Sequence, residues 1–402
     1  MSNKHTLTRS SLVSPRRRSL MMASAGLMGA GLVGLPTLSR AEEAIKVGIL
    51  QPFSGGLEAL GAQGGQATRL ALEEVNESGG ILGGRMFEMI RADTKTDPKT
   101  AVERTNELIR RYRVNAIIGP VTSAERDAIQ PLVERYKTPL LYATDYEGGT
   151  CSRYVTLYSS VPDQWVSTFI PYLAENVGKN MFLIGSDYVW PRKINEAIGK
   201  VAAEKGSKVV AEEYTPWGVK DYTSTLRKIE SSGADVVVMS IVGADAVTFI
   251  KQFAAAGLQD KVKVAFFGFS ENYLAGLTPN ESEGIYTVCN FTEALDKPEA
   301  KALVRKVRDR FGEDAIVSNT VDAHYTMTQF YIEAIKKANS ADKEAITDAI
   351  VGQTLMSGNG KVTLRESDRH ADLNILIAQA QGGKMQVLED MGLIKASQQC
   401  AA

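Results

Sequence analysis

The sequence is poor in the residues that most often carry out catalysis or bind metals. It holds only three histidines and three cysteines in 402 residues. None of them has the spacing of a zinc site, and no G-x-x-x-x-G-K-[ST] phosphate-binding loop occurs. The sequence therefore predicts no metal, no cofactor and no active site that depends on histidine or cysteine.

Long hydrophobic runs are also absent. Beyond the N-terminal segment, no stretch approaches the ~18 apolar residues that a membrane-spanning helix needs. The first 41 residues hold six of the 46 basic residues and none of the 47 acidic ones, so the rest of the chain has a net charge of −7. Such a charge argues against nucleic acid and anionic membrane surfaces as partners. We expect no nucleic-acid partner and no direct membrane insertion.

Residues 1–41 have the features of an export signal. Three arginines at 16–18 precede a weakly apolar, glycine-rich stretch, and small residues follow up to Ala41. This pattern predicts a signal peptide that is cleaved near Ala41, and hence a periplasmic protein. The arginine pair followed by Ser-Leu-Met favours a twin-arginine signal, and an ordinary secretory signal is the alternative.

From residue 45 onward, short apolar runs alternate with amphipathic segments. We expect strands at 45–50, 86–91, 116–119 and 139–142 with helices between them, and the alternation starts again near Tyr158. This order predicts an α/β fold with parallel, doubly wound sheets. The length suggests two Rossmann-like lobes joined by crossover segments. The expected boundaries are 42–158 plus 284–337 for lobe I, 159–283 plus 338–395 for lobe II, and 396–402 for a tail.

Two segments place aromatic and polar side chains where predicted strands end. One follows the apolar run 139–142 and the other follows the run 181–184. Open α/β sheets bind ligands at the carboxyl ends of their strands, and small-molecule pockets combine apolar walls with a few polar groups. Packing at a strand edge is the structural alternative for each residue. The candidate ligand-binding residues here are Tyr142, Thr144, Asp145, Tyr188 and Trp190.

Two further candidates lie where predicted helices begin. Ser123 follows Gly-Pro-Val-Thr after one strand, and Asp245 lies just past another. A helix N-terminus has free N–H groups and a partial positive charge, so both residues are candidates for ligand contact. Capping of their own helices is an equally good interpretation. Separately, an oxidising compartment permits a Cys151–Cys289 disulfide, which the spacing alone does not establish.

Several motifs resemble a known family. The run from 61 to 85, with Ala-Leu-Glu-Glu-Val-Asn and Gly-Gly-Ile-Leu-Gly-Gly-Arg, resembles type I periplasmic solute-binding proteins of the branched-chain amino acid group. Tyr-Glu-Gly at 146–148, Gly-Ser-Asp-Tyr at 185–188 and Gly-Lys-Val-Thr at 360–363 resemble its urea and short-chain amide branch.

The resemblance implies a clam-shell of two lobes that binds a small solute in the cleft and docks on the permease subunits of an ABC importer. On matching positions, it implies a pocket formed by Ser123, Tyr142, Thr144, Tyr188 and Trp190, with Asp245 after the last cleft strand.

Three positions depart from the pattern of the amide branch. Trp190 replaces a smaller aromatic residue, Val121 replaces a tyrosine, and Asp145 replaces an apolar or neutral residue. An unpaired buried carboxylate is unfavourable, so Asp145 facing the cleft would pair with a cation or an N–H group of the ligand. We therefore expect urea, a short-chain amide or a related amino or cationic compound.

Two other functions stay open at this point. One is a ligand-binding sensor that works with a receptor kinase or chemoreceptor, and the other is a branched-chain amino acid-binding protein. An amidohydrolase would need a catalytic constellation such as Ser-Lys or Cys-Lys-Glu, and Cys151 has no histidine near it in the sequence. We expect no enzyme activity.

Overall fold

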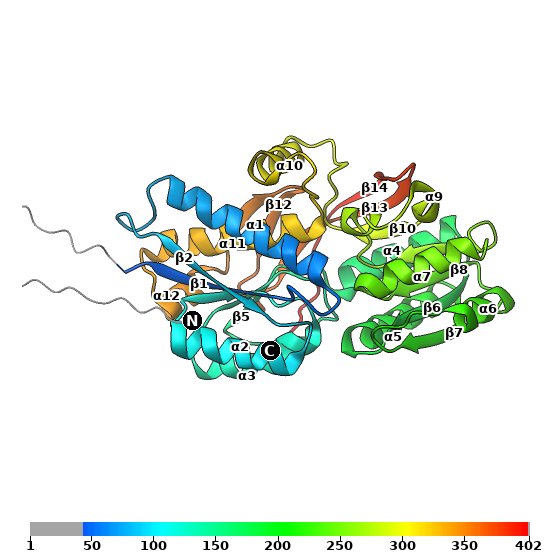
Figure 1. Cartoon of the computed structure of the whole chain (residues 1–402), viewed down its shortest axis with the longest axis horizontal. Coiled ribbons are helices and arrows are strands. Elements are labelled where there is room, and N and C mark those ends of the chain that lie inside the picture. Colours follow the sequence, from blue (N-terminus) through cyan, green and yellow to red (C-terminus); the bar gives the residue numbers. More distant parts are fainter. Residues whose placement is uncertain (1–42, 401–402) are drawn as a thin grey trace, which may run out of the picture. The chain divides into compact units, whose positions relative to one another are not determined.

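The computed structural model describes residues 43–400. The predicted export signal therefore lies outside the described residues. Within residues 43–400, two sheets with helices on their faces confirm the α/β prediction (Figure 1). No helix in this range combines the length and apolar character needed to cross a bilayer.

The first sheet has five parallel strands in the order β2-β1-β3-β4-β5. Its central strands are short and fully buried, which is typical of parallel sheets that are covered on both faces. The strands are β1 (Ile45–Gln51), β2 (Phe87–Asp93), β3 (Ala116–Ile118), β4 (Leu140–Tyr142) and β5 (Val155–Leu157).

Helices cover both faces of this five-stranded sheet. Figure 1 shows α1 and α11 on one face and α2 and α3 on the other. A six-residue π-helix, η1 (Glu107–Tyr112), continues α2. These helices are α1 (Glu58–Glu77), α2 (Pro98–Asn106), α3 (Ser123–Arg135) and α11 (Asn319–Ala338). Two further helices pack on them: α10 (Pro298–Phe311) contacts α1, and α12 (Lys343–Ala349) contacts α11.

Helices α1 and α11 pack closely because Gly64 faces the buried imidazole of His324. A Cβ atom on Gly64 would lie 2.8 Å from His324 Nε2. That nitrogen accepts a hydrogen bond from Gln51 Nε2 at 2.9 Å, while Nδ1–H donates to the carbonyl of Thr320 at 2.9 Å. Burial lowers the pKa of His324 to about 4, so the imidazole is neutral at pH 7.

The second sheet has nine strands in the order β11-β12-β13-β10-β9-β8-β6-β7, with β14 paired to β13. Strands β6 to β10 run parallel, whereas β11 to β14 pair antiparallel. The strands are β6 (Asn180–Ser186), β7 (Lys208–Thr215), β8 (Val236–Ser240), β9 (Lys263–Phe266), β10 (Tyr286–Cys289), β11 (Thr354–Ser357), β12 (Gly360–Leu364), β13 (Ala371–Gln381) and β14 (Lys384–Ile394).

The helices that accompany this nine-stranded sheet lie between its parallel strands in the chain, except that the first helix precedes them. They are α4 (Pro162–Asn176), α5 (Val189–Glu204), α6 (Thr223–Ser231), α7 (Gly243–Ala255) and the short α8 (Glu271–Leu274) and α9 (Pro279–Ser282). The chain first reaches this sheet after β5, leaves it after β10, and returns to it after α12.

Two elements belong to the other lobe than the expected boundaries assign. Strand β10 was expected in lobe I, but it pairs with β9 and β13 and so belongs to the nine-stranded sheet. Helix α12 was expected in lobe II, but it packs on α11, and its Glu344 forms ion pairs with Lys137 and Arg153 beside the five-stranded sheet. The other boundaries stay predictions.

The predicted pairing of Cys151 with Cys289 is wrong. Cys151 is bonded to Cys400, and their Cα atoms are 5.6 Å apart. Cys289 is a free thiol, 3% exposed, at the end of β10. The reason is topological: β10 carries Cys289 into the core of the nine-stranded sheet, whereas Cys151 lies on an exposed loop that the C-terminal segment reaches.

Candidate ligand-binding site

A small cavity lies at the carboxyl ends of strands from both sheets. Its volume is about 80 Å³, room for roughly six water-sized groups if each needs about 10–15 Å³. The five-stranded sheet and its helices contribute mainly Leu57, Leu60, Val121, Ser123, Ala143, Thr144, Asp145, Asn319 and Thr320. The nine-stranded sheet and its helices contribute Trp165, Tyr188, Trp190, Val242, Phe267, Gly268 and Tyr273.

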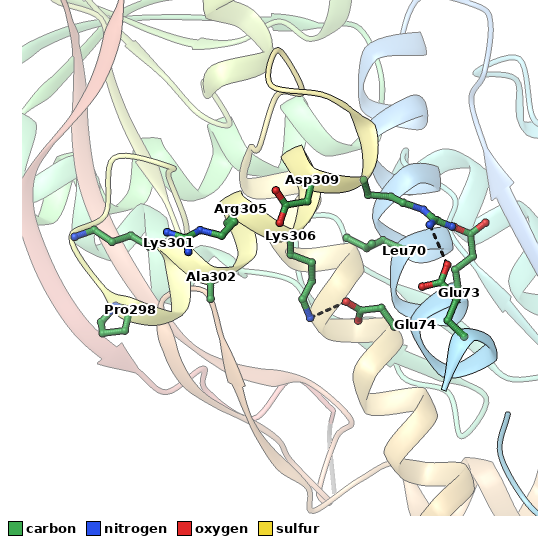
Figure 2. A pocket seen from close by; sticks show the side chains of 11 residues that line it. Leu70, Glu73, Glu74, Pro298, Lys301, Ala302, Arg305, Lys306 and Asp309 are labelled. Carbon is green, nitrogen blue, oxygen red and sulfur yellow. Dashed lines mark hydrogen bonds and ion pairs between the residues drawn. The ribbon is translucent and has the colours of Figure 1, made fainter. Parts of the chain in front are cut away.

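A larger groove of about 630 Å³ between α1 and α10 has a different character (Figure 2). Acidic residues of α1 form ion pairs with basic residues of α10 across this groove. Lys306 lies 2.8 Å from Glu74, and Arg310 forms ion pairs with Glu73 and Glu77. None of the predicted ligand-binding residues lines it. The small cavity is therefore the candidate site.

One wall of the cavity is aromatic. Trp165 comes from the first turn of α4, and Tyr188 and Trp190 lie where α5 begins. The rings of Trp165 and Phe267 meet edge to face at 5.2 Å, and the centroids of Trp165 and Trp190 are 6.2 Å apart. Such pairs hold each other in place, so the wall is a preformed surface for a flat or apolar group.

Two hydrogen-bond donors in this aromatic wall have no partner among the described residues. They are the Nε1–H groups of Trp165 and Trp190, whose side chains are only 1% and 6% exposed. Leaving a buried donor unpaired is unfavourable by about 1–3 kcal/mol. An acceptor atom of a bound solute would remove that penalty.

Asp145 supplies hydrogen-bond acceptors on the other side of the cavity. Its Oδ1 accepts a hydrogen bond from the backbone N–H of Ser160 at 2.6 Å, and its Oδ2 accepts from Asn319 Nδ2 at 3.4 Å. Burial raises the pKa of this carboxyl group. Because a carboxylate offers about four acceptor positions, Asp145 can still accept hydrogen bonds from a ligand.

Ser123 reaches the cavity from the N-terminus of α3. Thr122, not Ser123, caps this helix, through a reciprocal pair of hydrogen bonds with Glu125. The Ser123 hydroxyl instead donates to Glu147 at 2.6 Å, and Arg126 binds the other oxygen of Glu147 at 2.9 Å. Burial disfavours the charged form of Arg126, but the adjacent carboxylates of Glu147 and Asp127 raise its pKa, so Glu147 stays paired with a cation.

The structure brings five of the seven predicted residues to the cavity and leaves two outside its lining. Ser123, Thr144, Asp145, Tyr188 and Trp190 line it. Tyr142 is fully buried behind it, and its hydroxyl donates to the carbonyl of Val121 at 2.7 Å. The carboxylate of Asp245, in the first turn of α7, accepts a hydrogen bond from the backbone of Gly218 at 2.7 Å.

Sequence reasoning missed several residues that line the cavity. Trp165, Tyr273 and Asn319 line the cavity and were not among the predicted ligand-binding residues. Each of them lies at or near the start of a helix. For Trp165 and Asn319, the available signal was that both helices start soon after serine residues, since Ser159 and Ser160 precede the helix of Trp165 and Ser318 precedes Asn319.

These features define a class of protein. Two α/β units contribute to one small cavity with an aromatic wall and a few polar groups, which is the arrangement of a protein that binds a small solute. The chain belongs to the periplasmic binding protein family, whose profile matches residues 44–384. The family consists of solute-binding proteins rather than enzymes.

Individual relatives are distant in sequence but similar along most of their length. The Leu/Ile/Val-binding protein homolog 7 of Brucella suis biovar 1 (strain 1330) is 24% identical over 337 residues, which cover 78% of this chain and 82% of that protein.

Solved structures share the fold. A solute-binding protein of an ABC transporter from R. palustris, in complex with benzoate, has a TM-score of 0.82 at 21% identity and covers 89% of this chain and 99% of that chain. A branched-chain amino acid transporter substrate-binding protein from Streptococcus pneumoniae, in complex with isoleucine, has a TM-score of 0.77 at 20% identity and covers 88% and 100%. These similarities confirm the predicted two-lobed, clam-shell fold.

Proposed function

We propose that this protein captures a small polar solute in the cavity and delivers it to an ABC importer from the periplasm. Membership of the periplasmic binding protein family supports the binding role. The R. palustris protein described above belongs to an ABC transporter and the Streptococcus pneumoniae protein to an amino acid transporter, which supports the delivery role. The signal-like sequence of residues 1–41 supports export.

The proposed ligand is urea, a short-chain amide or a related amino compound. The observation that carries this proposal is that one small cavity is lined both by residues with unpaired donors and by a carboxylate with acceptor capacity left over. The indole N–H groups of Trp165 and Trp190 suit a carbonyl oxygen, and the carboxylate of Asp145 suits N–H groups. An amide presents both kinds of group in one plane, and that plane can lie against the aromatic rings.

Aromatic carboxylates are a second candidate. Relatives of similar fold were solved with benzoate, 3,4-dihydroxy benzoic acid and 4-hydroxybenzoate, and the aromatic wall of the cavity would suit such rings. Two features weigh against them. The carboxylate of Asp145 would repel an anionic ligand, and a cavity of about 80 Å³ is small for a ring with a carboxylate.

A thermal-shift screen followed by isothermal titration tests the ligand class. The panel holds urea, acetamide, propionamide, choline, benzoate and isoleucine. A ligand at 100 times its dissociation constant stabilises the folded protein by about 2.7 kcal/mol, which a melting curve detects. We expect stabilisation by urea or a small amide. Stabilisation by benzoate or isoleucine alone would contradict the proposal.

Conservative tryptophan variants test the role of the indole groups. Trp165→Phe and Trp190→Phe keep an aromatic ring and remove one donor each. Since a hydrogen bond contributes about 0.5–1.5 kcal/mol, each change should weaken amide binding by roughly 3- to 10-fold. Trp217→Phe is the matched control because Trp217 is 41% exposed and does not line the cavity. If Trp217→Phe weakened amide binding as much as the other two variants, the role given to the indole groups of Trp165 and Trp190 would be contradicted.

Uptake measurements separate transport from sensing. Deleting the gene should abolish uptake of the labelled ligand at micromolar concentration. Normal uptake together with a lost transcriptional or chemotactic response would instead favour the sensor alternative.

A further inference from the structure

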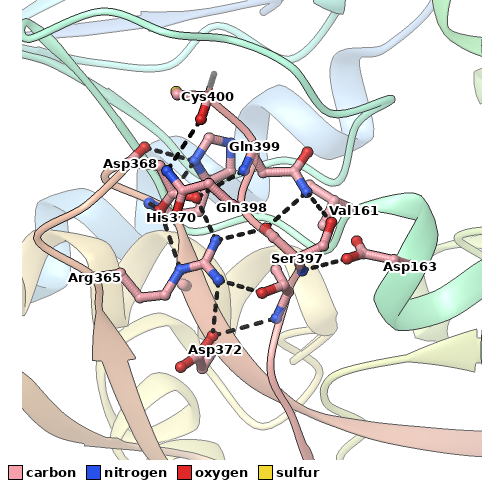
Figure 3. Close-up of polar contacts among 12 residues, drawn as sticks. Val161, Asp163, Arg365, Asp368, His370, Asp372, Ser397, Gln398, Gln399 and Cys400 are labelled. Atoms are coloured by element: carbon pink, nitrogen blue, oxygen red, sulfur yellow. Dashed lines mark hydrogen bonds and ion pairs between the residues drawn. The ribbon is translucent and has the colours of Figure 1, made fainter. Parts of the chain in front are cut away.

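The last residues of the chain form a strap, here residues 395–400, that continues from β14 of the nine-stranded sheet. Figure 3 shows this strap held by side chains from the β12–β13 turn and from α4. Arg365 donates hydrogen bonds to the carbonyls of Ala396 and Ser397, the latter at 3.0 Å. Asp163 accepts a hydrogen bond from the backbone N–H of Ser397. The strap therefore has a defined path.

The strap ends on a loop that belongs to the ligand site. We call residues 145–151, which follow β4 of the five-stranded sheet, the site loop. Cys400 is bonded to Cys151 at the end of this loop. In addition, Gln399 Oε1 accepts a hydrogen bond from the backbone N–H of Gly149 at 3.2 Å. The strap thus links the nine-stranded sheet covalently to the loop that carries Asp145.

The site loop has little structure of its own. It contains neither helix nor strand, and Gly148 and Gly149 have φ values of 85° and 80°. A backbone hydrogen bond of 3.1 Å from the Tyr146 N–H to the Ser160 carbonyl holds one point of the loop, and the rest of its position depends on side-chain contacts. On the cavity side these are the hydrogen bonds of Asp145 with Ser160 and Asn319, and those of Glu147 with Ser123 and Arg126.

On the opposite side, one buried cluster holds both the site loop and the strap. Asp368 binds Arg365 at 2.5 Å and accepts a hydrogen bond from the backbone N–H of Gln399 at 3.0 Å. The backbone carbonyl of Asp368 lies 2.7 Å from His370 Nδ1, so the other imidazole nitrogen accepts from the hydroxyl of Tyr146. The Tyr146 oxygen also accepts from the backbone N–H of Thr150 at 3.1 Å.

We infer that the C-terminal strap is a positioning element of the ligand site. Through the Cys151–Cys400 bond and Gln399, it holds the site loop so that Asp145 and the Ser123–Glu147 pair face the cavity. The crossover segments of the backbone already connect the two sheets, and the strap is a further connection between them. The inference rests on the proposed function in one respect, which is that ligand binds in this cavity.

Hydrogen exchange of the ligand-free, full-length mature protein tests the positioning role. The variant Cys400→Ser removes the disulfide, and Gln399→Ala removes one strap contact but keeps the disulfide. We expect amide exchange in residues 143–151 to be about 10-fold faster in Cys400→Ser and moderately faster in Gln399→Ala. Exchange in α6, far along the chain at Thr223–Ser231, should not change. Unchanged exchange in 143–151, or equal acceleration throughout, would overturn the inference.

Acetamide binding gives a second readout. The dissociation constant for acetamide should rise at least severalfold in Cys400→Ser, and treating the wild-type protein with a phosphine reductant should reproduce the effect. Cys289→Ser is the control because Cys289 is outside the strap. An unchanged dissociation constant in Cys400→Ser would also overturn the inference. If acetamide does not bind the wild-type protein, the proposed ligand class fails, and the exchange measurement still decides the role of the strap.

Discussion

Asp145 connects the ligand cavity to segments where the chain passes between the two sheets. Its carboxylate accepts a hydrogen bond from Ser160, which lies in the first crossover after β5. Asn319 bridges from Asp145 to the backbone N–H of Asn290, just after β10. A ligand group that binds Asp145 therefore contacts a residue that both crossovers help to orient. Closure of two-lobed binding proteins takes place at such connecting segments.

The variant Asp145→Asn tests the contribution of the charge. Asparagine keeps the size of the side chain and loses the anionic acceptor. Hydrogen bonds to charged groups contribute about 1.5–3 kcal/mol, so affinity for an amide or amino ligand should fall by roughly 10- to 100-fold in isothermal titration. Asp296→Asn is a suitable control because the Asp296 side chain is 91% exposed, pairs with Lys301 and lies outside the cavity lining. Unchanged affinity and unchanged ligand preference in Asp145→Asn would contradict the role given to this residue.

The pH dependence of binding follows from the same residue. Burial raises the pKa of Asp145, so its carboxyl group takes up a proton at a higher pH than an ordinary aspartate. Protonation removes acceptor capacity for N–H groups of a ligand. Affinity of the wild-type protein should therefore decrease as the pH falls, and this decrease should be absent in Asp145→Asn.

At the scale of helices and strands, α1 packs unusually close to its neighbours beside the five-stranded sheet. Helix α1 contains Gly61, Gly64 and Gly65, all buried. A Cβ atom on Gly61 would lie 2.1 Å from the carbonyl oxygen of Pro52, and one on Gly64 would meet the His324 ring. Glycine is unfavourable inside a helix, so its presence here reflects the lack of space for any side chain.

The pair Gly64→Ala and Gly199→Ala tests this packing argument. Gly64→Ala forces α1 away from α11 and should reduce the free energy of unfolding by about 1–3 kcal/mol. Gly199 lies inside α5, and a Cβ atom there would have no neighbour within 4 Å. Gly199→Ala should therefore increase the free energy of unfolding by about 0.5–1 kcal/mol. Chemical denaturation measures both, and equal effects of the two variants would contradict the account.

The order of elements was largely predictable from the sequence because buried parallel strands are short apolar runs between amphipathic helices. β3 and β4 were recognised in this way. The sheet to which β10 belongs was not predictable, since it depends largely on pairing with β13, which lies three helices and two strands later in the chain. The partner of Cys151 was missed for the same reason, because 249 residues separate it from Cys400.

The candidate site was predictable in part. Asp145, Tyr188 and Trp190 follow strands, and the rule that ligands bind at strand ends selected residues that line a cavity. Their contact with a ligand stays a prediction. Tyr142 and Asp245 obey the same rule but point to other partners, Val121 and Gly218. Trp165 belongs to a helix that starts after a crossover, where no local pattern indicates which side chain faces the other lobe.

At the scale of the whole molecule, residues 43–400 combine two sheets, one shared cavity and a covalent strap. The half with the nine-stranded sheet lines the cavity with the indole groups and the half with the five-stranded sheet with the carboxylate, so the proposed amide ligand would contact both. Binding would then be coupled to the relative position of the lobes, because the favourable contacts form together only when both lobes are in place. The strap limits how the site loop can move during that process.

The most direct test of the central claim is an NMR titration of the indole N–H groups. The sequence has three tryptophans, so protein labelled with ¹⁵N-tryptophan gives three indole signals, and Trp217→Phe assigns one of them. As urea or acetamide saturates the protein, the signals of Trp165 and Trp190 should move downfield as they form hydrogen bonds, while that of Trp217 changes little. Calorimetric binding of the same ligand with both cavity signals unmoved would contradict the proposal.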